Sequence, residues 1–537
     1  MQRPVSVKTL VFFAALAAPA IVHYVLLYLY AVNAPRLDDF SEVLTFLPNF
    51  HAASTWQEKL GIFFAVYQDH RYGITHIINL LTDGINFRHY VLWGNLLLPA
   101  YIYLIWRALQ QHRLQKEITV IAALLFFNLQ TWYGTYWASI LLTSLGSLPI
   151  ALGTFLLVCS PNPRLLPYAL FSAICLTYTL GNGVFVWPLA AAYSLLDNYR
   201  KQQLLWNTRT LSWLITGIIV LIFYFHDFHF FNKGGHGGLA ATDFLQQAIN
   251  NIPNMAIGFF SLAGSHLLYY SGQTDWRIAL ASTVGLIETA TLIWLLWRGA
   301  LRTYPALRLL LAFVFFTMLS IAVARAATIN IGQTLQGHYK LYPATYLLLL
   351  ITATFDWLTQ RKSDFIKQIW CIFLCLTAAM FAASLYLFIA TLAQYNQDLA
   401  KDTKQWLYSN TLKYGETRLF VKQPNKKLTA AVDSGFYNPW TLLQDNEIPD
   451  DLIYSDKCPP STTLAANIES HPHAHAVKID IKAPTATQKA CLQGEKQAIY
   501  FTINMGNHTE NSDASLWVPR NGEAGEDKGP WTLYALP

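Results

Sequence analysis

The chain has 537 residues, of which 54% are hydrophobic and only 13% are charged, and its formal net charge is +6. This composition excludes an ordinary soluble domain, in which about a quarter of the residues are charged. It predicts a polytopic membrane protein. Most of this net charge lies in short loops, where it reports membrane topology, so we expect no nucleic-acid partner.

The chain begins with an apolar run that is about twice as long as the core of a signal peptide, although Arg3 and Lys8 precede it as in such a peptide. The run can cross about 30 Å of hydrocarbon, so we predict an uncleaved first helix. A polar and aromatic outer loop, residues 33–71, follows it. Two segments of this loop, 41–50 and 56–68, have apolar residues at helical spacing and are predicted to lie in the membrane interface.

Further apolar segments of roughly membrane-crossing length follow, which makes about eleven crossings in total. They are residues 88–109, 118–130, 138–159, 165–180, 182–197, 211–226, 277–297, 308–328, 342–358 and 366–394. Segment 254–270 is also apolar, but a full crossing there would invert everything downstream. We expect it to be re-entrant or interfacial, and its crossing stays open.

The loop charges predict the orientation of these spans. The four loops "RALQQHRLQK", "NYRKQQLLWNTR", "WRGALRTYPALR" and "TQRKSDFIK" are rich in Lys and Arg and fall on the same side as the N-terminus. Short loops of this kind face the cytoplasm. The opposite loops are rich in aromatic residues, His and Gly, so the 33–71 loop is expected outside the cytoplasm.

The composition changes at about residue 396, and no membrane-length apolar run follows. We therefore predict an all-α polytopic membrane domain over residues 1–395 and a small β-rich soluble domain over 396–537 on the outer side. Cys458 and Cys491 are the only cysteines of that domain and could pair in an oxidising compartment. The other four cysteines lie in apolar spans, where packing is the simplest role.

Asp38 and Asp39, in "NAPRLDDFSEV", follow directly on the first helix. A solvated pair of acids at the interface is one interpretation. Catalysis is the other, because abstracting a proton from a sugar hydroxyl needs a carboxylate held near the acceptor. A neighbouring acid can raise the pKa of that carboxylate, orient it, or help to hold a divalent cation. We take the pair as the candidate catalytic residues.

Asp69, His70 and Arg71 end the same outer loop in "YQDHRYG". An Arg guanidinium can grip a phosphate with two hydrogen bonds, and His adds a further donor. This cluster is therefore a candidate for binding an anionic lipid head group. The alternative is an Arg that extends its side chain to the membrane surface without a ligand.

Arg325, His338 and Lys340 bracket a Gly-containing outer loop in "VARAATINIGQTLQGHYKLYP". Three cationic or protonatable groups on the side that is otherwise poor in Lys and Arg call for an anion, and a phosphate is the expected one. The loop is the second candidate substrate-binding cluster.

Weaker candidates come next. His226, Asp227, His229 and His236 lie in a Gly-rich outer loop without the spacing of a known metal site, and a mobile substrate-covering loop is preferred there. His471, His473 and His475 are expected in a surface turn.

The aromatic residues of "NLQTWYGTYWASI" are interpreted first as an aromatic belt at the membrane surface and second as a surface on which a sugar ring stacks. No Walker loop, G-x-S-x-G or H-E-x-x-H motif occurs.

The sequence resembles the GT-C superfamily of integral-membrane glycosyltransferases. The likeness rests on the first helix leading into "RLDDF", the interfacial segments after it, about eleven spans and an outer C-terminal domain. In that superfamily the first outer loop carries an acidic motif whose Asp is proposed to activate the acceptor, and here it falls on Asp38 and Asp39. Late outer loops often supply basic residues to the donor phosphate, which Arg325 and Lys340 match in type.

The resemblance implies a glycosyltransferase of the bacterial inner membrane that works on the periplasmic side. It would move a sugar from a polyprenyl-phosphate donor, such as undecaprenyl phosphate, to a glycan, lipid or protein acceptor. A flippase or transporter for a polyprenyl-linked glycan would also gather cations and aromatic residues around a lipid head group. An oligosaccharide polymerase or ligase is the third interpretation. The residues do not decide which of the two acids is the base, or whether a metal is needed.

Overall fold

The computed structural model covers the whole chain and describes most of it. The described residues are 7–67, 70–82, 84–228, 241–267, 275–326, 330–362, 365–413, 417, 421–442, 453–455, 466–469, 476–481, 488–493, 498–503, 514–519 and 531–535.

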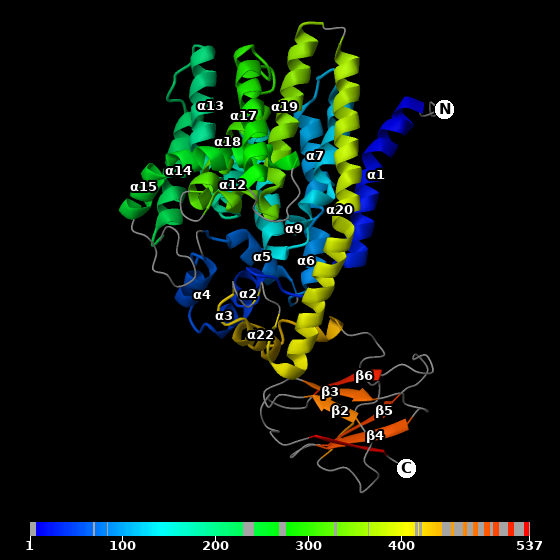
Figure 1. The fold of residues 1–537 in the computed structure, drawn as a ribbon. Coiled ribbons are helices and arrows are strands. Elements are labelled where there is room, and N and C mark those ends of the chain that lie inside the picture. Colours follow the sequence, from blue (N-terminus) through cyan, green and yellow to red (C-terminus); the bar gives the residue numbers. More distant parts are fainter. Residues whose placement is uncertain are drawn as a thin grey trace, which may run out of the picture. The chain divides into compact units, whose positions relative to one another are not determined.

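Helices dominate the described part of the chain (Figure 1). In the first half they are α1 (Val7–Tyr30), α2 (Asp39–Glu42), α3 (Phe46–Ala52), α4 (Trp56–Phe63), α5 (Gly73–Leu81), α6 (Phe87–Gly94), α7 (Leu97–Ala108), α8 (Gln115–Phe126), α9 (Trp132–Thr135), α10 (Ala138–Ile140), α11 (Gly146–Val158), α12 (Leu166–Thr177), α13 (Val186–Arg200) and α14 (Thr208–Phe225). A π-helical turn, Leu141–Leu145, joins α10 to α11.

The second half continues with α15 (Ala241–Asn250), α16 (Ile252–Ala263), α17 (Asp275–Trp297), α18 (Pro305–Ala326), α19 (Leu341–Gln360), α20 (Ile366–Ser409) and α22 (Pro424–Asp433). Short 3-10 turns are Leu129–Thr131, Pro163–Leu165, Gly181–Phe185, Gly264–Leu267, Ile331–Leu335, Gly337–Tyr339 and Pro439–Leu442.

Short antiparallel strands follow near the C-terminus: β1 (Ile453–Ser455), β2 (Ala466–Glu469), β3 (Ala476–Ile481), β4 (Gln488–Gln493), β5 (Ala498–Ile503), β6 (Ala514–Pro519) and β7 (Thr532–Ala535). Their orders are β1-β5-β4-β7 and β2-β3-β6. The segments between the strands lie outside the described residues, and a folded β-rich soluble domain stays a prediction.

The chain divides into two compact units. Unit 1 comprises residues 1–31, 49–82 and 89–393, and unit 2 comprises residues 32–48, 83–88 and 394–537. Part of the outer loop, 32–48, thus belongs to the same unit as the C-terminal segment. Helix α20 belongs to unit 1 up to Ala393 and to unit 2 from Gln394.

Seven described helices are long and apolar enough to cross a membrane, or up to eight if α8 and the segment after it, which bends by 45°, count as one span. The chain is accordingly a multi-pass membrane protein. The seven are Thr9–Tyr30, Ala138–Val158, Thr208–Phe225, Asp275–Trp297, Pro305–Ala326, Gly337–Gln360 and Ile366–Leu407.

This count is lower than the predicted eleven because several apolar segments form short or broken helices. Segment 165–180 forms α12, which has 12 residues and is therefore only about 18 Å long. Segment 88–109 breaks between α6 and α7 at Asn95, which is fully buried. The Asn95 amide donates to the carbonyls of Val91 and Thr135, each at 2.7 Å, and accepts from His23 Nε2 at 3.0 Å.

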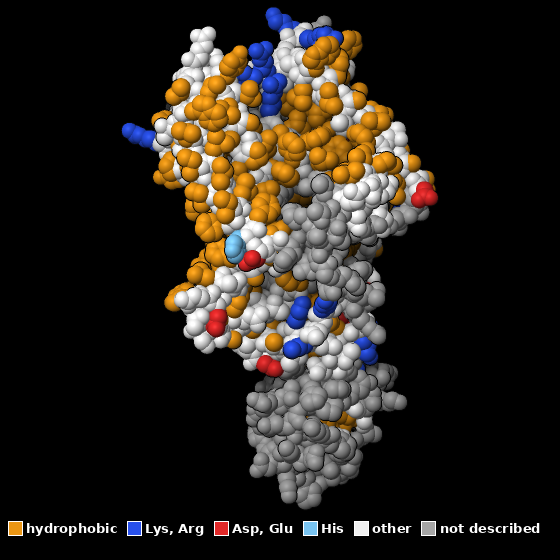
Figure 2. All heavy atoms as spheres, turned by 90° about the vertical axis from the view of Figure 1, so that its left-hand side faces the viewer, with side chains coloured by type: hydrophobic (Ala, Val, Ile, Leu, Met, Phe, Trp, Pro, Cys, Tyr) orange, Lys and Arg blue, Asp and Glu red, His pale blue; other side chains and the backbone are white. Residues whose placement is uncertain are grey.

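Within unit 1 the helices pack around α19, the most buried of the candidate spans. It contacts α8, α17 and α18, and Figure 1 shows α17, α18 and α19 running side by side. The outer helices carry exposed apolar side chains instead, for example Ile222 and Phe223 of α14, which are 63% and 67% exposed. Figure 2 shows hydrophobic side chains covering this face of the helices, as expected of helices that contact lipid.

The Lys/Arg-rich loops meet at one end of these helices. The ring of His112 lies 5.4 Å from that of Tyr304, and the backbone N–H of Leu301 donates to Asp356 at 2.7 Å. Arg200 lies within electrostatic range of the start of α18. In Figure 2 Lys and Arg side chains gather at this end of unit 1, which agrees with the loop pattern read from the sequence.

Candidate functional site

The outer loop after α1 is anchored inside unit 2 by Asn33. Its amide donates to the Asn438 carbonyl at 3.2 Å and the Thr441 hydroxyl at 2.7 Å, and its side-chain oxygen accepts from the Phe87 N–H at 2.8 Å. The Tyr437 hydroxyl donates to the Asn33 carbonyl at 2.7 Å. One asparagine therefore ties together three segments that are far apart in the sequence.

The two adjacent acids have different surroundings. Asp39 is 1% exposed, and its Oδ2 accepts the backbone N–H of Arg36 at 3.0 Å. Asp38 is partly exposed and begins α2 without a side-chain cap. Leu37, just before them, has φ of 39°, a left-handed conformation that costs a leucine about 1–2 kcal/mol. Strain of this kind is typical of sites where the surrounding structure fixes the backbone for function.

Lys427 of α22 lies near this acidic pair, also in unit 2. Its ammonium donates to the Ser41 hydroxyl. Burial lowers the pKa of Lys427, while the nearby charge of Asp38 raises that pKa and Lys422 lowers it. Asp38 therefore has a cationic neighbour. The sequence carries no signal for this contact, because Lys427 lies far along the chain within an ordinary polar helix.

The residues around the pair do not fit a divalent cation. No group of three metal-ligating side chains occurs among the described residues. Lys427 adds a positive charge near Asp38, and one oxygen of Asp39 already accepts a backbone hydrogen bond. We therefore derive no step through a metal.

Arg71, predicted to bind a phosphate, lies in unit 1 and is 7% exposed. Its Nε donates to the Tyr224 carbonyl at 2.8 Å, and its two other nitrogens donate to the carbonyls of Phe64 and His226. These carbonyls lie at the ends of α4 and α14, where helices have unsatisfied acceptors. Arg71 thus joins two helix ends. Asp69 lies outside the described residues.

His70 lies directly before this anchor and pairs in a β-bridge with Tyr67. Its ring lies 5.8 Å from that of Tyr72 and also close to Gly181, where an added Cβ would stand 2.5 Å from the His70 Nδ1. Gly181 therefore leaves room for the imidazole.

A groove of about 620 Å³ lies beside Arg71 in unit 1. Its walls are mainly aromatic and aliphatic side chains of α5, α12 and α14, and Arg71 and His226 line it too. Burial raises the pKa of Tyr178, which also lines the groove, and the charge of Arg71 lowers that pKa. The groove has the size and apolar character of a lipid or small-molecule site.

Arg325 and Lys340 of the late outer loop make defined contacts in unit 1. Arg325 Nε donates to the Tyr339 hydroxyl at 2.8 Å. Lys340 is 3% exposed, and its ammonium donates to the Ser265 carbonyl at 2.6 Å. The structure thus places Lys340 beside the segment after α16 and Arg325 beside Tyr339 of its own loop.

His338, between them, lies among aromatic rings. The centroids of Tyr133, Trp137 and Tyr339 are 6.2, 5.8 and 4.0 Å from that of its imidazole. The predicted aromatic segment and the predicted cationic loop therefore meet. Gly337 allows this approach, since a Cβ there would stand 2.6 Å from Tyr133.

A largely buried contact between a histidine and a glutamate near Lys340 was not predicted. His266 Nε2 lies 3.1 Å from Glu288 Oε1, and the two side chains are 4% and 12% exposed. Glu288 stands within α17, a candidate span, where an ionisable residue is costly and usually functional. Its signal was present in the sequence as a single acid in the apolar stretch "GLIETATL".

The weaker candidates are only partly described. His226 Nδ1 and Asp227 Oδ2 lie 2.9 Å apart, and both side chains are well exposed. His229, His236, His471, His473 and His475 lie outside the described residues. Cys491 is disulfide-bonded, and its predicted partner Cys458 also lies outside the described residues.

The predicted site residues fall into both units. Asp38 and Asp39 belong to unit 2, whereas Arg71, Arg325, His338 and Lys340 belong to unit 1. No known family model matches the chain, and no curated protein matches its sequence. The interpretation of these residues therefore rests on their own chemistry.

Proposed function

We propose that the chain is a glycosyltransferase of the bacterial inner membrane that moves a sugar from a polyprenyl-phosphate donor to a cell-envelope glycan, lipid or protein acceptor. The reaction takes place on the periplasmic side, where the C-terminal segment forms a small β-rich module. The observation that carries the proposal is the acidic turn at the end of α1, in which a strained leucine precedes a buried and a partly exposed aspartate.

Asp38 is the general base in this proposal. It is the accessible acid of the pair, and the positively charged Lys427 lies near it. An ionised carboxylate can take the proton of the acceptor hydroxyl as the hydroxyl oxygen attacks the anomeric carbon of the donor. Asp39 positions the turn through its bond to the Arg36 N–H and does not touch the acceptor.

The cations of unit 1 serve the donor. In this proposal Arg325, His338 and Lys340 stabilise the phosphate, which leaves with an added negative charge when its bond to the sugar breaks. The apolar groove beside Arg71 offers a wall for an isoprenoid chain. Arg71 itself supports that groove by joining α4 and α14.

The test compares lipid extracts and glycan profiles from cells that carry the wild-type chain, Asp38→Asn, Asp39→Asn or no chain. Asp38→Asn should fold normally and lower sugar transfer by about 10² to 10⁴. Asp39→Asn should lower the amount of folded protein, because its carboxylate is buried in the turn. Asp433→Asn, which changes an exposed acid of α22 in the same unit, is the matched control and should keep full transfer.

The competing function is a carrier that flips a polyprenyl-linked glycan. The contact of His266 with Glu288, which lies inside a candidate span, favours it, because such pairs occur in proton-coupled transporters. Full sugar transfer by Asp38→Asn made in normal amounts would reject the transferase mechanism. If His266→Gln then abolished glycan export while every sugar was still attached, the carrier would be the better account.

A further inference from the structure

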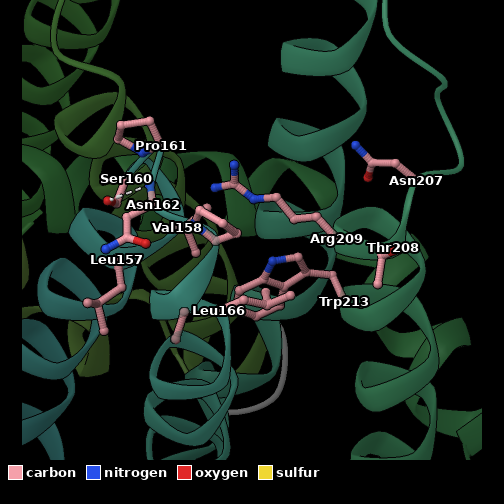
Figure 3. A pocket seen from close by; sticks show the side chains of 12 residues that line it. Leu157, Val158, Ser160, Pro161, Asn162, Leu166, Asn207, Thr208, Arg209 and Trp213 are labelled. Carbon is pink, nitrogen blue, oxygen red and sulfur yellow. Dashed lines mark hydrogen bonds between the residues drawn. The ribbon is translucent and has the colours of Figure 1, made fainter.

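A second pocket lies at the Lys/Arg-rich end of unit 1, away from the residues considered above. It has a volume of about 480 Å³ and is formed by the end of α11, the turn before α12 and the start of α14 (Figure 3). This size lies within the range of small-molecule sites. The pocket belongs to neither predicted substrate cluster.

The polar side chains of this pocket are neutral, apart from one that carries a positive charge. Its twelve lining residues include no Asp or Glu, and Arg209 is its one charged member. In Figure 3 the Arg209 side chain extends from α14 across Trp213 toward the turn that carries Ser160 and Asn162. No hydrogen bond or ion pair of the Arg209 guanidinium occurs within the described residues. Asp197, which like Arg209 acts electrostatically on Tyr193, is paired with Lys201 at 2.8 Å.

Trp213 supplies the second observation. The residue is fully buried, and its indole N–H donates to no atom of the described residues. In Figure 3 the indole nitrogen lies on the edge of the ring nearest Arg209. An unmade hydrogen bond of a buried donor costs about 1–3 kcal/mol. A ligand that accepts from this N–H would recover that energy.

The turn before α12 presents further donors toward the same space. The Asn162 side-chain oxygen accepts the Arg164 N–H at 3.0 Å, which leaves the amide group free to donate. The Ser160 hydroxyl oxygen accepts the Asn162 N–H at 3.3 Å, as drawn in Figure 3, so its own hydrogen can point into the pocket. Together with Arg209 and Trp213, these groups match the several acceptor oxygens of one phosphate.

We propose that this pocket binds the phosphate group of an anionic glycerophospholipid. The positive charge of Arg209 has no ion-pair partner within the described residues, so the pocket favours an anionic ligand over a neutral one. The remaining walls are apolar, and the adjoining helices face lipid, since Tyr168 and Phe171 of α12 are 65% and 67% exposed. A lipid can fill both parts of the site, whereas a free phosphate ion would fill only the polar part.

The experiment measures lipid binding to the purified full chain by native mass spectrometry after delipidation in detergent. Phosphatidylglycerol and phosphatidylcholine with the same acyl chains are titrated separately, and phosphatidylglycerol is also titrated with millimolar inorganic phosphate present. Wild type should bind one phosphatidylglycerol more tightly than phosphatidylcholine, and phosphate should not displace it. Arg209→Gln should weaken this binding about tenfold or more, since charge-assisted hydrogen bonds are lost.

Trp213→Phe removes only the indole donor and should weaken phosphatidylglycerol binding a few-fold, which also decides the matter if Arg209→Gln does not fold. Arg164→Gln is the matched control, because Arg164 is exposed in the same turn but does not line the pocket. Equal losses in Arg209→Gln and Arg164→Gln would show general surface charge only. Equal binding of the two lipids, displacement by phosphate, or unchanged binding in both pocket variants would each overturn the proposal.

Discussion

Arg71 shows how the same side chain fits two roles that the sequence cannot separate. The sequence places it in a cationic cluster suited to a phosphate, and the structure commits three of its nitrogens to backbone carbonyls. A guanidinium presents five N–H groups in a fixed plane, which suits several acceptors at once. The structural role follows from the convergence of two helix ends, which only the fold creates.

Arg71→Lys should therefore destabilise the protein. A lysine ammonium cannot reach three carbonyls in different directions, so we expect a loss of about 2–4 kcal/mol and a lower thermal unfolding temperature in detergent. Arg107→Lys, at an exposed position, is the control and should unfold like wild type. If Arg71→Lys unfolded like wild type but no longer used the polyprenyl-phosphate sugar donor, Arg71 would instead bind the phosphate.

His76 predicts a pH dependence of stability. The residue is 5% exposed, its Nδ1 lies 2.7 Å from the Phe63 carbonyl, and burial lowers its pKa to about 4. The unfolded chain protonates this histidine near pH 6.5, so it binds more protons than the folded chain between pH 6.5 and 4. The neutral His76 therefore contributes to the free energy of unfolding. This contribution is fully present above pH 6.5 and is lost as the pH falls toward 4, by an amount on the order of 3 kcal/mol.

Thermal unfolding at pH 7.5 and 5 measures this effect. His76→Gln keeps a donor for the Phe63 carbonyl and removes the titration, so its unfolding temperature should fall less between the two pH values than that of wild type. His51→Gln, at an exposed site, should keep the wild-type pH dependence. Identical pH dependence in all three proteins would show that His76 does not titrate as proposed.

Helix α17 packs so closely against α16 and the turn after it that the contact requires glycine. A Cβ on Gly285 would stand 2.0 Å from the Phe260 carbonyl oxygen, and one on Gly264 would stand 2.2 Å from the Ala281 oxygen. The described part of segment 254–270, which was predicted as re-entrant or interfacial, lies in the 12-residue α16 and the 3-10 turn Gly264–Leu267. The close crossing brings Ser265 and His266 to Lys340 and Glu288.

Gly285→Ala should disrupt this crossing. The added methyl group meets backbone, which cannot turn aside like a side chain, so we expect a loss of about 1–3 kcal/mol or more in the free energy of unfolding. Gly61→Ala in α4 is the control, because nothing lies within 4 Å of its Cβ position, and it should be neutral or stabilise by about 0.5–1 kcal/mol. Equal stability of both variants in chemical or thermal unfolding would contradict the close packing.

The number of spans was the least predictable property of the elements. Hydropathy does not distinguish an apolar segment that forms one membrane-long helix from one that forms a shorter or broken helix. Segment 165–180 is apolar enough for a crossing but forms a 12-residue helix, and segment 88–109 breaks at the buried Asn95. The polar contacts that stabilise the break come from α1 and from Thr135, which the local sequence does not contain.

For the whole molecule, the loop charges predict the topology. A reporter fused after Pro48 or at the C-terminus should report the periplasm, and one fused near Gln111 the cytoplasm, because the Lys/Arg-rich loops meet at the end that carries Gln111. Alkaline phosphatase and green fluorescent protein fusions give opposite signals for the two sides. A cytoplasmic signal from the C-terminal fusion would contradict the prediction that the C-terminal segment lies in the periplasm.

The sequence by itself determined the membrane class, the shared end of the basic loops and the residues worth considering, because composition, apolar run length and loop charge depend only on local chemistry. It could not rank Asp38 against Asp39, since neighbours of the same type differ only in burial. Lys427 beside Asp38, Glu288 beside His266 and the role of Arg71 were decided by tertiary structure alone. Each of these contacts joins segments far apart in the chain, and only packing determines which distant segments meet.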